Sequence, residues 1–418
     1  MTRPGSVLAW LGTTILGLAL LPAAPAAEKA APKSKPAAID ASKFPTLQAA
    51  LDAVPESGGV VTLPPGEFVL TKPLVLARED TRIEGAGTST HLRNVNTNGE
   101  PALVIRHRDQ PQNRRARLWR VHLANFRVTG NTNSGDGIVL QGVDELFIHG
   151  VSVERNGGNG ISLLDCYEDP RIANNLITYN AKAGLNIVGG HDIVVSGNQF
   201  EENQDALRCV DSFNLTMTGN NIDDHLRHGV VIENTYGSVL SGNMIEECEG
   251  TAIILDRDCY GITISANVIA HNLGGGVDLR DAWGCAVSAN TFVLVHNGSI
   301  RIGPDSGRVA ITGNSFGNSH IGGKDKRPAT APTPMGRDEG TGILLNATSD
   351  IVITGNTFTG LSEEAVRGTG ECRRVIVTSN VIADFNRRAA KKLPAINLGK
   401  ARESIVKDNA ISNGAPKK

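Results

Sequence analysis

The stretch "FNLTMTGNNIDDHLRHGVVIENT", residues 213–235, holds two short runs of alternating apolar and polar residues on either side of a turn-like "TGNN". Close relatives of this stretch recur along most of the chain. Alignment on one recurring asparagine gives successive spacings of 22 to 24 residues, interrupted by one of 42 and one of 29. A period of this kind is typical of a repeat architecture. The aligned asparagines are Asn175, Asn198, Asn220, Asn243, Asn267, Asn290, Asn314, Asn356, Asn380 and Asn409.

Each repeat carries one alternating run that ends just before the asparagine, as in "DIVVSGN", and a second that follows a glycine-rich turn, as in "GVVI". Short alternation with β-branched residues indicates strands with one buried face. The repeats are too short for a strand plus a crossover helix, so consecutive strands must coil directly into parallel stacks. The sequence therefore predicts an all-β fold, a single right-handed parallel β-helix of about 10–12 rungs with an N-terminal helix and strand cap.

The recurring asparagine has a structural explanation. In such a coil the equivalent residues of successive rungs stack about 4.8 Å apart, and their side-chain amides can hydrogen-bond along the stack. Asparagine also tolerates the left-handed backbone that a sharp turn requires. We therefore interpret the repeated asparagine as part of the scaffold.

The N-terminal end of the chain reads as an export signal. Arg3 precedes an apolar run at 7–21 and the small-residue stretch "APA", so residues 1–26 are predicted to be a signal peptide. A membrane anchor is the alternative interpretation. Residues 27–38, rich in Ala, Pro and Lys, are predicted to be a linker. We expect an exported protein without stable membrane insertion once the signal has been removed.

The rest of the chain divides into two parts. Residues 39–120 lack the period and include "FPTLQAALDAV" (44–54), which has helical spacing, so they are assigned to the N-terminal cap and the first irregular coils. Residues 121–418 are assigned to right-handed parallel β-helix repeats. The Pro, Gly and charged residues of 317–340 predict an exposed loop insertion within them.

Composition narrows the partners and cofactors. The net charge of −2 and the pI near 6.6 provide no basic field for nucleic acid. The six cysteines form no CxxC pair, so we interpret most of them as small buried hydrophobic residues rather than disulfides or metal ligands. No metal is predicted at the candidate site, but the motifs "DD" (223–224) and "DRD" (256–258) leave calcium open as a cofactor. A monomer is expected.

The second strand of each repeat sorts its residues by side. Val230 and Ile232 face inward, so Val231 between them faces outward. Extended through the repeats, this register gives two outward columns, and a third column lies just before each strand; between residues 205 and 303 these columns hold ionisable residues. These are His228, Asp205, Arg208, Asp278 and Arg301, interpreted as candidate catalytic residues, and Glu233, Asp256 and Arg280, interpreted as candidate substrate-binding residues.

Clustered ionisable groups on a flat sheet suit a shallow groove for an extended polysaccharide. Elimination from a uronic acid needs a base beside the sugar carboxylate, for which His228 is the candidate. It also needs a cation to neutralise that carboxylate, such as Arg208, Arg280 or Arg301. Hydrolysis would instead use paired carboxylates. Glu233 and Asp256, one rung apart, are near the separation of about 5–5.5 Å found in retaining glycosidases.

The stretch "FPTLQAALDAVPESGGVVTLPPGEFVL" (44–70) and the repeats resemble the pectin-lyase-like superfamily of right-handed β-helix proteins, over nearly all of the mature chain. The resemblance implies the fold, but the superfamily includes lyases, hydrolases, epimerases and non-catalytic members. The chain also resembles polygalacturonase-type glycoside hydrolases in part. Asp205 of "NQDALRCV" falls at the second aspartate of their Asp-Asp motif, and His228 of "RHGVVIEN" falls at their His-Gly motif. Gln204 and Ala183 stand where two further aspartates of those enzymes belong.

Two hypotheses remain from the sequence. The first is an exported enzyme that acts on a polysaccharide by lyase or epimerase chemistry, which the outward arginines and the missing aspartates favour over glycoside hydrolysis. The second is a non-catalytic glycan-binding or cell-surface β-helix. In that case Asp278–Arg301 and Asp256–Arg280 are ordinary ion pairs between rungs. Asp205–His228 is likewise a pair between rungs that fixes the turn.

Overall fold

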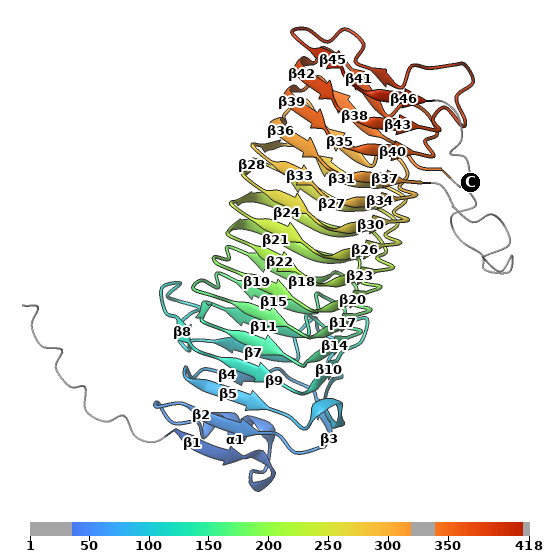
Figure 1. The fold of residues 1–418 in the computed structure, drawn as a ribbon. Coiled ribbons are helices and arrows are strands. Elements are labelled where there is room, and N and C mark those ends of the chain that lie inside the picture. The colour runs from blue at the N-terminus through green and yellow to red at the C-terminus, as the bar shows by residue number, and fades with distance from the viewer. Residues whose placement is uncertain (1–35, 319–338, 413–418) are drawn as a thin grey trace, which may run out of the picture. The chain divides into compact units, whose positions relative to one another are not determined.

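Short parallel strands make up nearly all of the regular structure, stacked coil upon coil (Figure 1). In this computed structural model the described residues are 36–318 and 339–412. The predicted signal peptide 1–26, most of the linker 27–38 and most of the loop insertion 317–340 lie outside them. A regular coil has three strands in succession, and each pairs in parallel with its equivalents in the neighbouring coils. We name the three resulting columns of strands face 1, face 2 and face 3, in the order in which the chain passes through them.

Face 1 consists of β4 (Leu74–Leu76), β7 (Leu103–Arg106), β11 (Ile138–Gln141), β15 (Ile161–Leu164), β18 (Ala183–Val188), β21 (Asp205–Phe213), β24 (His228–Tyr236), β27 (Thr251–Asp256), β31 (Gly275–Leu279), β35 (Ile300–Ile302), β38 (Ile343–Asn346), β41 (Val366–Thr369) and β44 (Ile396–Asn397). Face 2 consists of β1 (Ala37–Asp40), β2 (Gly59–Thr62), β5 (Thr81–Glu84), β9 (His122–Ala124), β13 (Phe147–His149), β16 (Arg171–Ala173), β19 (Val194–Ser196), β22 (Thr216–Thr218), β25 (Val239–Ser241), β29 (Thr263–Ser265), β33 (Ala286–Ser288), β36 (Gly307–Thr312), β39 (Ser349–Thr354), β42 (Arg373–Thr378) and β45 (Ile405–Lys407). Face 3 consists of β3 (Gly66–Leu70), β6 (Thr90–Asn94), β10 (Arg127–Thr129), β14 (Ser152–Glu154), β17 (Leu176–Thr178), β20 (Gln199–Glu201), β23 (Asn221–Asp223), β26 (Met244–Glu246), β30 (Val268–Ala270), β34 (Thr291–Val293), β37 (Ser315–Gly317), β40 (Thr357–Thr359), β43 (Val381–Ala383) and β46 (Ala410–Ser412).

Two predictions about the coil were too low. The sequence indicated two strands per repeat, but a third, on face 3, follows directly after the asparagine turn. From β10 onward these strands are three residues long, which is too short to show alternation. Face 3 counts fourteen strands in the described residues, against the predicted rungs of about 10–12. Counting asparagines missed the first coils, since β3, β6, β10 and β14 stack before the period begins.

The interior of the coil is apolar, as the alternation predicted. Val230 and Ile232 are fully buried, and the equivalent inward residues of the other repeats are buried with them. Burial of such side chains is the main favourable contribution to folding. All six cysteines are buried and unpaired, which confirms their interpretation as hydrophobic residues.

The predicted asparagine ladder is present. From Asn175 to Asn380, each side-chain Nδ2 donates to the Oδ1 of the ladder asparagine in the next coil at 2.9–3.0 Å, and Asn409 accepts the last of these bonds. One detail of the prediction was wrong, because the left-handed residue is the one before the asparagine. Gly219 has φ 64° and Ala266 has φ 54°. Glycine recurs there because it adopts this conformation without strain.

A second, shorter ladder follows the face 3 strands and was not predicted. Asn156 Nδ2 donates to Asn180 Oδ1 at 2.9 Å, and Asn180 Nδ2 donates to Asn203 Oδ1 at 2.8 Å. In the next coil the position holds His225, which is fully buried and whose Nδ1 lies 3.1 Å from the carbonyl oxygen of Asn203. A histidine thus replaces an asparagine in the interior of the coil.

The N-terminal edge of face 1 is met by the helix expected in 44–54. This is α1 (Leu47–Asp52), and the Thr46 side chain caps it by accepting from the Ala49 N–H at 3.1 Å. The Gln48 amide donates to Val75 O at 2.9 Å and accepts from Val75 N at 2.8 Å, which satisfies backbone groups of β4 at the open edge. The remaining short elements are η1 (Ala41–Lys43), η2 (Gly87–Ser89), β8 (Leu118–Trp119), β12 (Val143–Asp144), β28 (Cys259–Tyr260) and β32 (Ala282–Trp283).

Among the described residues there is no helix of the length and hydropathy needed to cross a membrane.

Candidate functional site

Seven of the eight residues predicted for the site lie in the face 1 strands from β21 to β35, and the eighth, Arg280, directly follows β31. The predicted vertical neighbours are in register. Asp205 pairs with His228, Glu233 with Asp256, and Asp278 with Arg301. Parallel pairing without offsets places these side chains about 4.8 Å apart, so the structure brings the predicted residues together on one surface.

Asp205 is bonded differently from the prediction. Its carboxylate is almost fully buried and pairs with the guanidinium of Arg227, whose Nε lies 2.9 Å from Oδ1. Oδ1 also accepts the backbone N–H of His228 at 3.0 Å. The recorded bond between the two rungs thus runs to the main chain of His228 and not to its imidazole. Arg227 immediately precedes His228 in sequence, but its role was not predicted because only the outward columns of the strands were considered.

The imidazole of His228 is held by the next coil. Its Nδ1 accepts the backbone N–H of Thr251 at 3.0 Å. Gly250 makes this close approach feasible, because a Cβ atom there would lie 2.4 Å from that nitrogen and 2.2 Å from the carbonyl oxygen of Arg227. Such distances are far inside van der Waals contact, so a side chain at position 250 would displace the ring.

Burial lowers the pKa of His228, and the positive charges of Arg227 and Arg280 lower it further, against the opposing effect of Asp205 and Asp278. The ring is therefore neutral near pH 7. A neutral imidazole whose Nδ1 accepts a hydrogen bond carries its proton on Nε2. In this tautomer His228 offers a donor to a ligand, and acting as a base at Nε2 would require the other tautomer.

The other carboxylates of the site are each engaged by arginine. Glu233 accepts from Arg208 at 3.0 Å and lies 2.6 Å from Arg257 Nε. Asp256 lies 3.6 Å from Arg280 Nη1. The predicted ion pairs between rungs are thus present, together with Arg257, which was not predicted.

Asp278 joins two of the predicted arginines. Its Oδ2 accepts from Arg280 Nε at 2.9 Å and from Arg301 Nη2 at 2.8 Å. Arg301 Nη2 also lies 3.2 Å from the hydroxyl of Thr251, so this network reaches the residue whose N–H holds His228. The predicted residues thus form a continuous polar surface over several coils.

The surface is hollowed beside Arg301. Two open hollows of 450 and 350 Å³ share Arg301, Leu344 and Arg367 in their linings. Arg367 is a site residue that was not predicted, although it lies in the same outward column, in register with Leu344. The missing signal was the alternation in "AVRGTG", where Gly368 occupies the inward position and weakens the pattern. Glu363 lies 2.7 Å from Arg367 Nη1 at the rim of the first hollow.

One group of the described residues has three possible metal ligands close together, and it is neither of the predicted calcium motifs. It consists of Glu246, Glu247 and His271, which lie at the C-terminal ends of the face 3 strands β26 and β30. The acidic pair 223–224 occupies the same position one coil earlier. Asp256 of the "DRD" motif instead forms an ion pair with Arg280 on face 1.

Comparison with known proteins agrees with the geometry. Residues 116–253 and 225–316 match the family described as the right-handed β-helix region. The chain thus has the right-handed parallel β-helix fold. No curated protein matches the sequence.

Solved structures share this fold at low sequence identity. The enzymatically active domain of tailspike protein 2 from bacteriophage CBA120 matches with a TM-score of 0.50 and 16% identity, over 64% of this chain and 45% of that one. Tailspike protein 3 of the same phage matches with a TM-score of 0.52 and 11% identity, over 78% of this chain and 56% of that one. The A-module of an Azotobacter vinelandii mannuronan C-5 epimerase matches with a TM-score of 0.49 and 15% identity, over 90% of this chain and 100% of that one. The matched part is thus about half of each tailspike chain.

Proposed function

We propose that the protein is an exported, carbohydrate-active β-helix protein that binds an extended acidic polysaccharide along face 1. We further propose that it modifies uronic acid units by elimination or epimerisation rather than by hydrolysis. The observation that carries the proposal is the pair Arg301 and Arg367, two guanidinium groups that line adjoining hollows on the outer side of one sheet. A guanidinium presents paired N–H donors that match a sugar carboxylate.

The charges around these arginines leave room for a ligand carboxylate. Arg367 has an exposed partner in Glu363, and its side chain is 38% exposed. Such exposed ion pairs contribute little to stability, so a bound uronate can replace Glu363 at small cost. Leu344 lies between the two arginines in register and supplies an apolar surface for the sugar ring.

The ion pairs of the face 1 carboxylates favour elimination or epimerisation over hydrolysis. Hydrolysis needs one carboxyl group as an acid and another as a base or nucleophile. Here Asp205, Glu233, Asp256 and Asp278 are all engaged by arginine. Elimination instead needs the uronate charge neutralised, so that a base can remove the proton at C5. The electron pair then forms the C4=C5 double bond as the C4–O4 bond breaks, and the leaving oxygen takes up a proton. In epimerisation the proton returns to C5 from the opposite side.

A second candidate is a non-catalytic glycan-binding β-helix. It is favoured by His228, whose Nδ1 accepts from Thr251 and whose proton therefore lies on Nε2. In that role His228 donates a hydrogen bond to the glycan and no base is required. The enzyme hypothesis needs the other tautomer of His228 or a base supplied by a different residue.

The two candidates separate in one set of measurements on the purified full chain with acidic and matched neutral polysaccharides. Elimination produces an unsaturated sugar with ultraviolet absorbance, hydrolysis produces reducing ends alone, and epimerisation exchanges the C5 proton for solvent deuterium. Binding of acidic glycan without any of these changes supports the binding protein. Failure to prefer acidic over neutral glycan contradicts the assignment of face 1.

Matched arginine variants test the place of binding. Arg367→Gln should weaken acidic-glycan binding at least about tenfold, because one charge-assisted hydrogen bond contributes about 1.5 kcal/mol. Arg374 is the control, since it lies on face 2, is 46% exposed and pairs with Asp350 in the same way. Arg374→Gln should leave the affinity unchanged. Equal effects of the two substitutions would show that general charge, and not face 1, attracts the glycan.

A further inference from the structure

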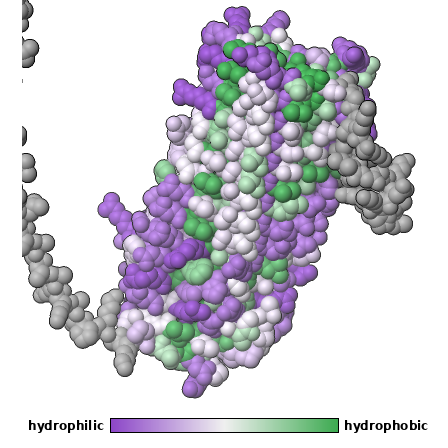
Figure 2. Space-filling model, viewed as in Figure 1, coloured by the Kyte–Doolittle hydropathy of each residue, from purple (hydrophilic) through white to green (hydrophobic). Residues whose placement is uncertain are grey.

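Face 3 carries a column of acidic residues that the proposed function does not use. The last residue of β20, β23 and β26 and the residue after it are acidic in three consecutive coils. A band of hydrophilic residues runs along these strands in the space-filling view (Figure 2). We name this column the acidic stripe, and it consists of Glu201, Glu202, Asp223, Asp224, Glu246 and Glu247.

The acidic stripe differs from face 1 in its charge balance. Within 36–318 and 339–412, no lysine or arginine forms an ion pair with any of its six carboxylates. Burial and then the like charges of Asp224 and Glu246 raise the pKa of Asp223 to about 6. Burial, Asp224 and Glu246 also raise the pKa of Glu247. The stripe therefore concentrates negative charge that attracts cations.

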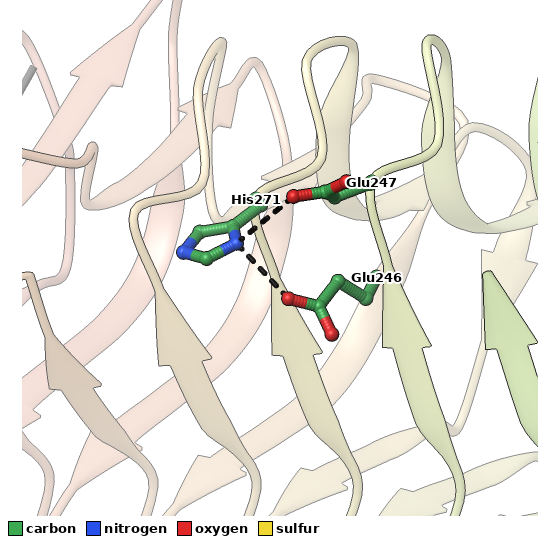
Figure 3. Close-up of side chains that lie close together, drawn as sticks. All are labelled: Glu246, Glu247 and His271. Atoms are coloured by element: carbon green, nitrogen blue, oxygen red, sulfur yellow. Dashed lines mark ion pairs between the residues drawn. The ribbon is translucent and has the colours of Figure 1, made fainter. Parts of the chain in front are cut away.

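In the coil that follows the acidic stripe, a histidine occupies the equivalent position. His271 follows β30, in the position that Glu247 occupies after β26. Its Nδ1 lies 3.1 Å from a carboxylate oxygen of Glu246 and 3.6 Å from one of Glu247 (Figure 3). The side chain is 12% exposed, and both ring nitrogens are buried without a hydrogen-bond partner among the described residues. The Nδ1 of a mostly buried imidazole thus lies at ion-pair distance from two carboxylates, and its Nε2 has no hydrogen-bond partner among the described residues.

These separations suit a shared metal ion. Two atoms bound to one ion at about 2.1 Å, with an angle of about 90–120° between them, lie about 3.0–3.6 Å apart. We propose that Glu246, Glu247 and His271 bind one divalent transition-metal ion, Zn²⁺ or Mn²⁺, that links two coils on face 3. Imidazole ligation selects such ions over Ca²⁺ and Mg²⁺, which prefer sites made of oxygen ligands only. Asp223 and Asp224 lie one coil earlier, where they reinforce the attraction for the ion.

The ion would act on stability rather than on the glycan. The candidate residues lie on face 3, whereas the candidate glycan surface lies on face 1. An ion bound only by the folded chain raises stability in proportion to the logarithm of its concentration over the dissociation constant. The proposal is therefore independent of the proposed function.

Calorimetric titration of the full chain, stripped with EDTA and free of any affinity tag, tests the site with Zn²⁺, Mn²⁺, Ca²⁺ and Mg²⁺ in turn. We expect one Zn²⁺ or Mn²⁺ per chain, at least tenfold tighter than Ca²⁺ or Mg²⁺, and a higher melting temperature in its presence. His271→Ala and Glu247→Gln should each weaken binding at least tenfold. Glu201→Gln is the control, because it removes a charge from the same stripe three coils from His271, and it should change affinity less than twofold.

Three results would overturn the proposal. The first is no binding of either transition metal to the wild-type chain, in which case a lower melting temperature of His271→Ala would identify an imidazolium–carboxylate ion pair only. The second is equal affinity of wild type and His271→Ala, which would show diffuse attraction by the stripe. The third is tight Ca²⁺ binding that does not depend on His271. If His271→Ala fails to fold, Glu247→Gln and the ¹⁵N shift of the wild-type His271 ring on adding Zn²⁺ decide between the same outcomes.

Discussion

Substitution of one asparagine in the middle of the ladder should destabilise the whole coil. Asn267 is 1% exposed, and its Nδ2 donates to Leu240 O and Asn290 Oδ1, both at 3.0 Å. Its Oδ1 accepts from the backbone N–H of Asn243 at 3.0 Å and from Asn243 Nδ2 at 2.9 Å. Asn267→Ala therefore leaves three buried groups short of a partner, namely two N–H groups of Asn243 and the Leu240 carbonyl.

The expected loss is large for a single substitution. An unsatisfied buried polar group costs about 1–3 kcal/mol, so three such groups in the lower part of that range cost about 3–5 kcal/mol. Asn409 is the control, because it is the last rung of the ladder and is partly exposed, so water can replace its side chain. Asn409→Ala should cost about 1 kcal/mol.

Equilibrium unfolding in urea, followed by circular dichroism, measures both free energies. A solenoid can open in part, so hydrogen exchange in the coils around residues 243 and 290 should accompany the global measurement. The reasoning is refuted if Asn267→Ala unfolds within 1 kcal/mol of the wild type, or if Asn409→Ala is equally damaging. Either outcome would mean that packing of the inward aliphatic side chains, and not the amide ladder, holds the turns in place.

The remaining predictions concern backbone strain and a buried histidine. Ala266→Gly should stabilise the chain by about 0.5–1 kcal/mol, because Ala266 has φ 54°. Gly219→Ala should destabilise the chain by about 1 kcal/mol, because Gly219 has φ 64°, although no atom lies within 4 Å of the added Cβ. Thermal unfolding of both variants measures the two effects, and effects of the same sign would contradict this reasoning. Burial lowers the pKa of His225 from 6.5 to about 4, so the unfolded chain binds the proton more readily, and stability should fall by about 3 kcal/mol as the pH drops from 6.5 to 4. His225→Asn, which restores the residue type of the second ladder, should remove that part of the pH dependence in urea unfolding with EDTA present, and parallel curves for the two proteins would refute it.

Much of the candidate site followed from register alone. Once Val230 and Ile232 were assigned inward, the outward residues within the strands, such as Arg208 and Arg301, followed by counting, because parallel pairing in register preserves the offset from rung to rung. The same count extended two coils beyond Arg301 would have reached Arg367. The contacts did not follow from counting. Asp205 turns to Arg227 and to a main-chain N–H, since a buried carboxylate takes the nearest donors that desolvation leaves available.

The amino-acid sequence by itself determined the period, the inward and outward columns, the asparagine ladder and the burial of the cysteines. These features depend on the local alternation of apolar and polar residues, and on contacts between residues of the same type at equivalent positions of successive repeats. Only the tertiary structure revealed the third strand of each coil, the tautomer of His228 and the meeting of His271 with Glu246 and Glu247. Each of these depends on distances between atoms of different coils, or on a strand too short to show alternation. The periodicity of the sequence indicates neither such distances nor such strands.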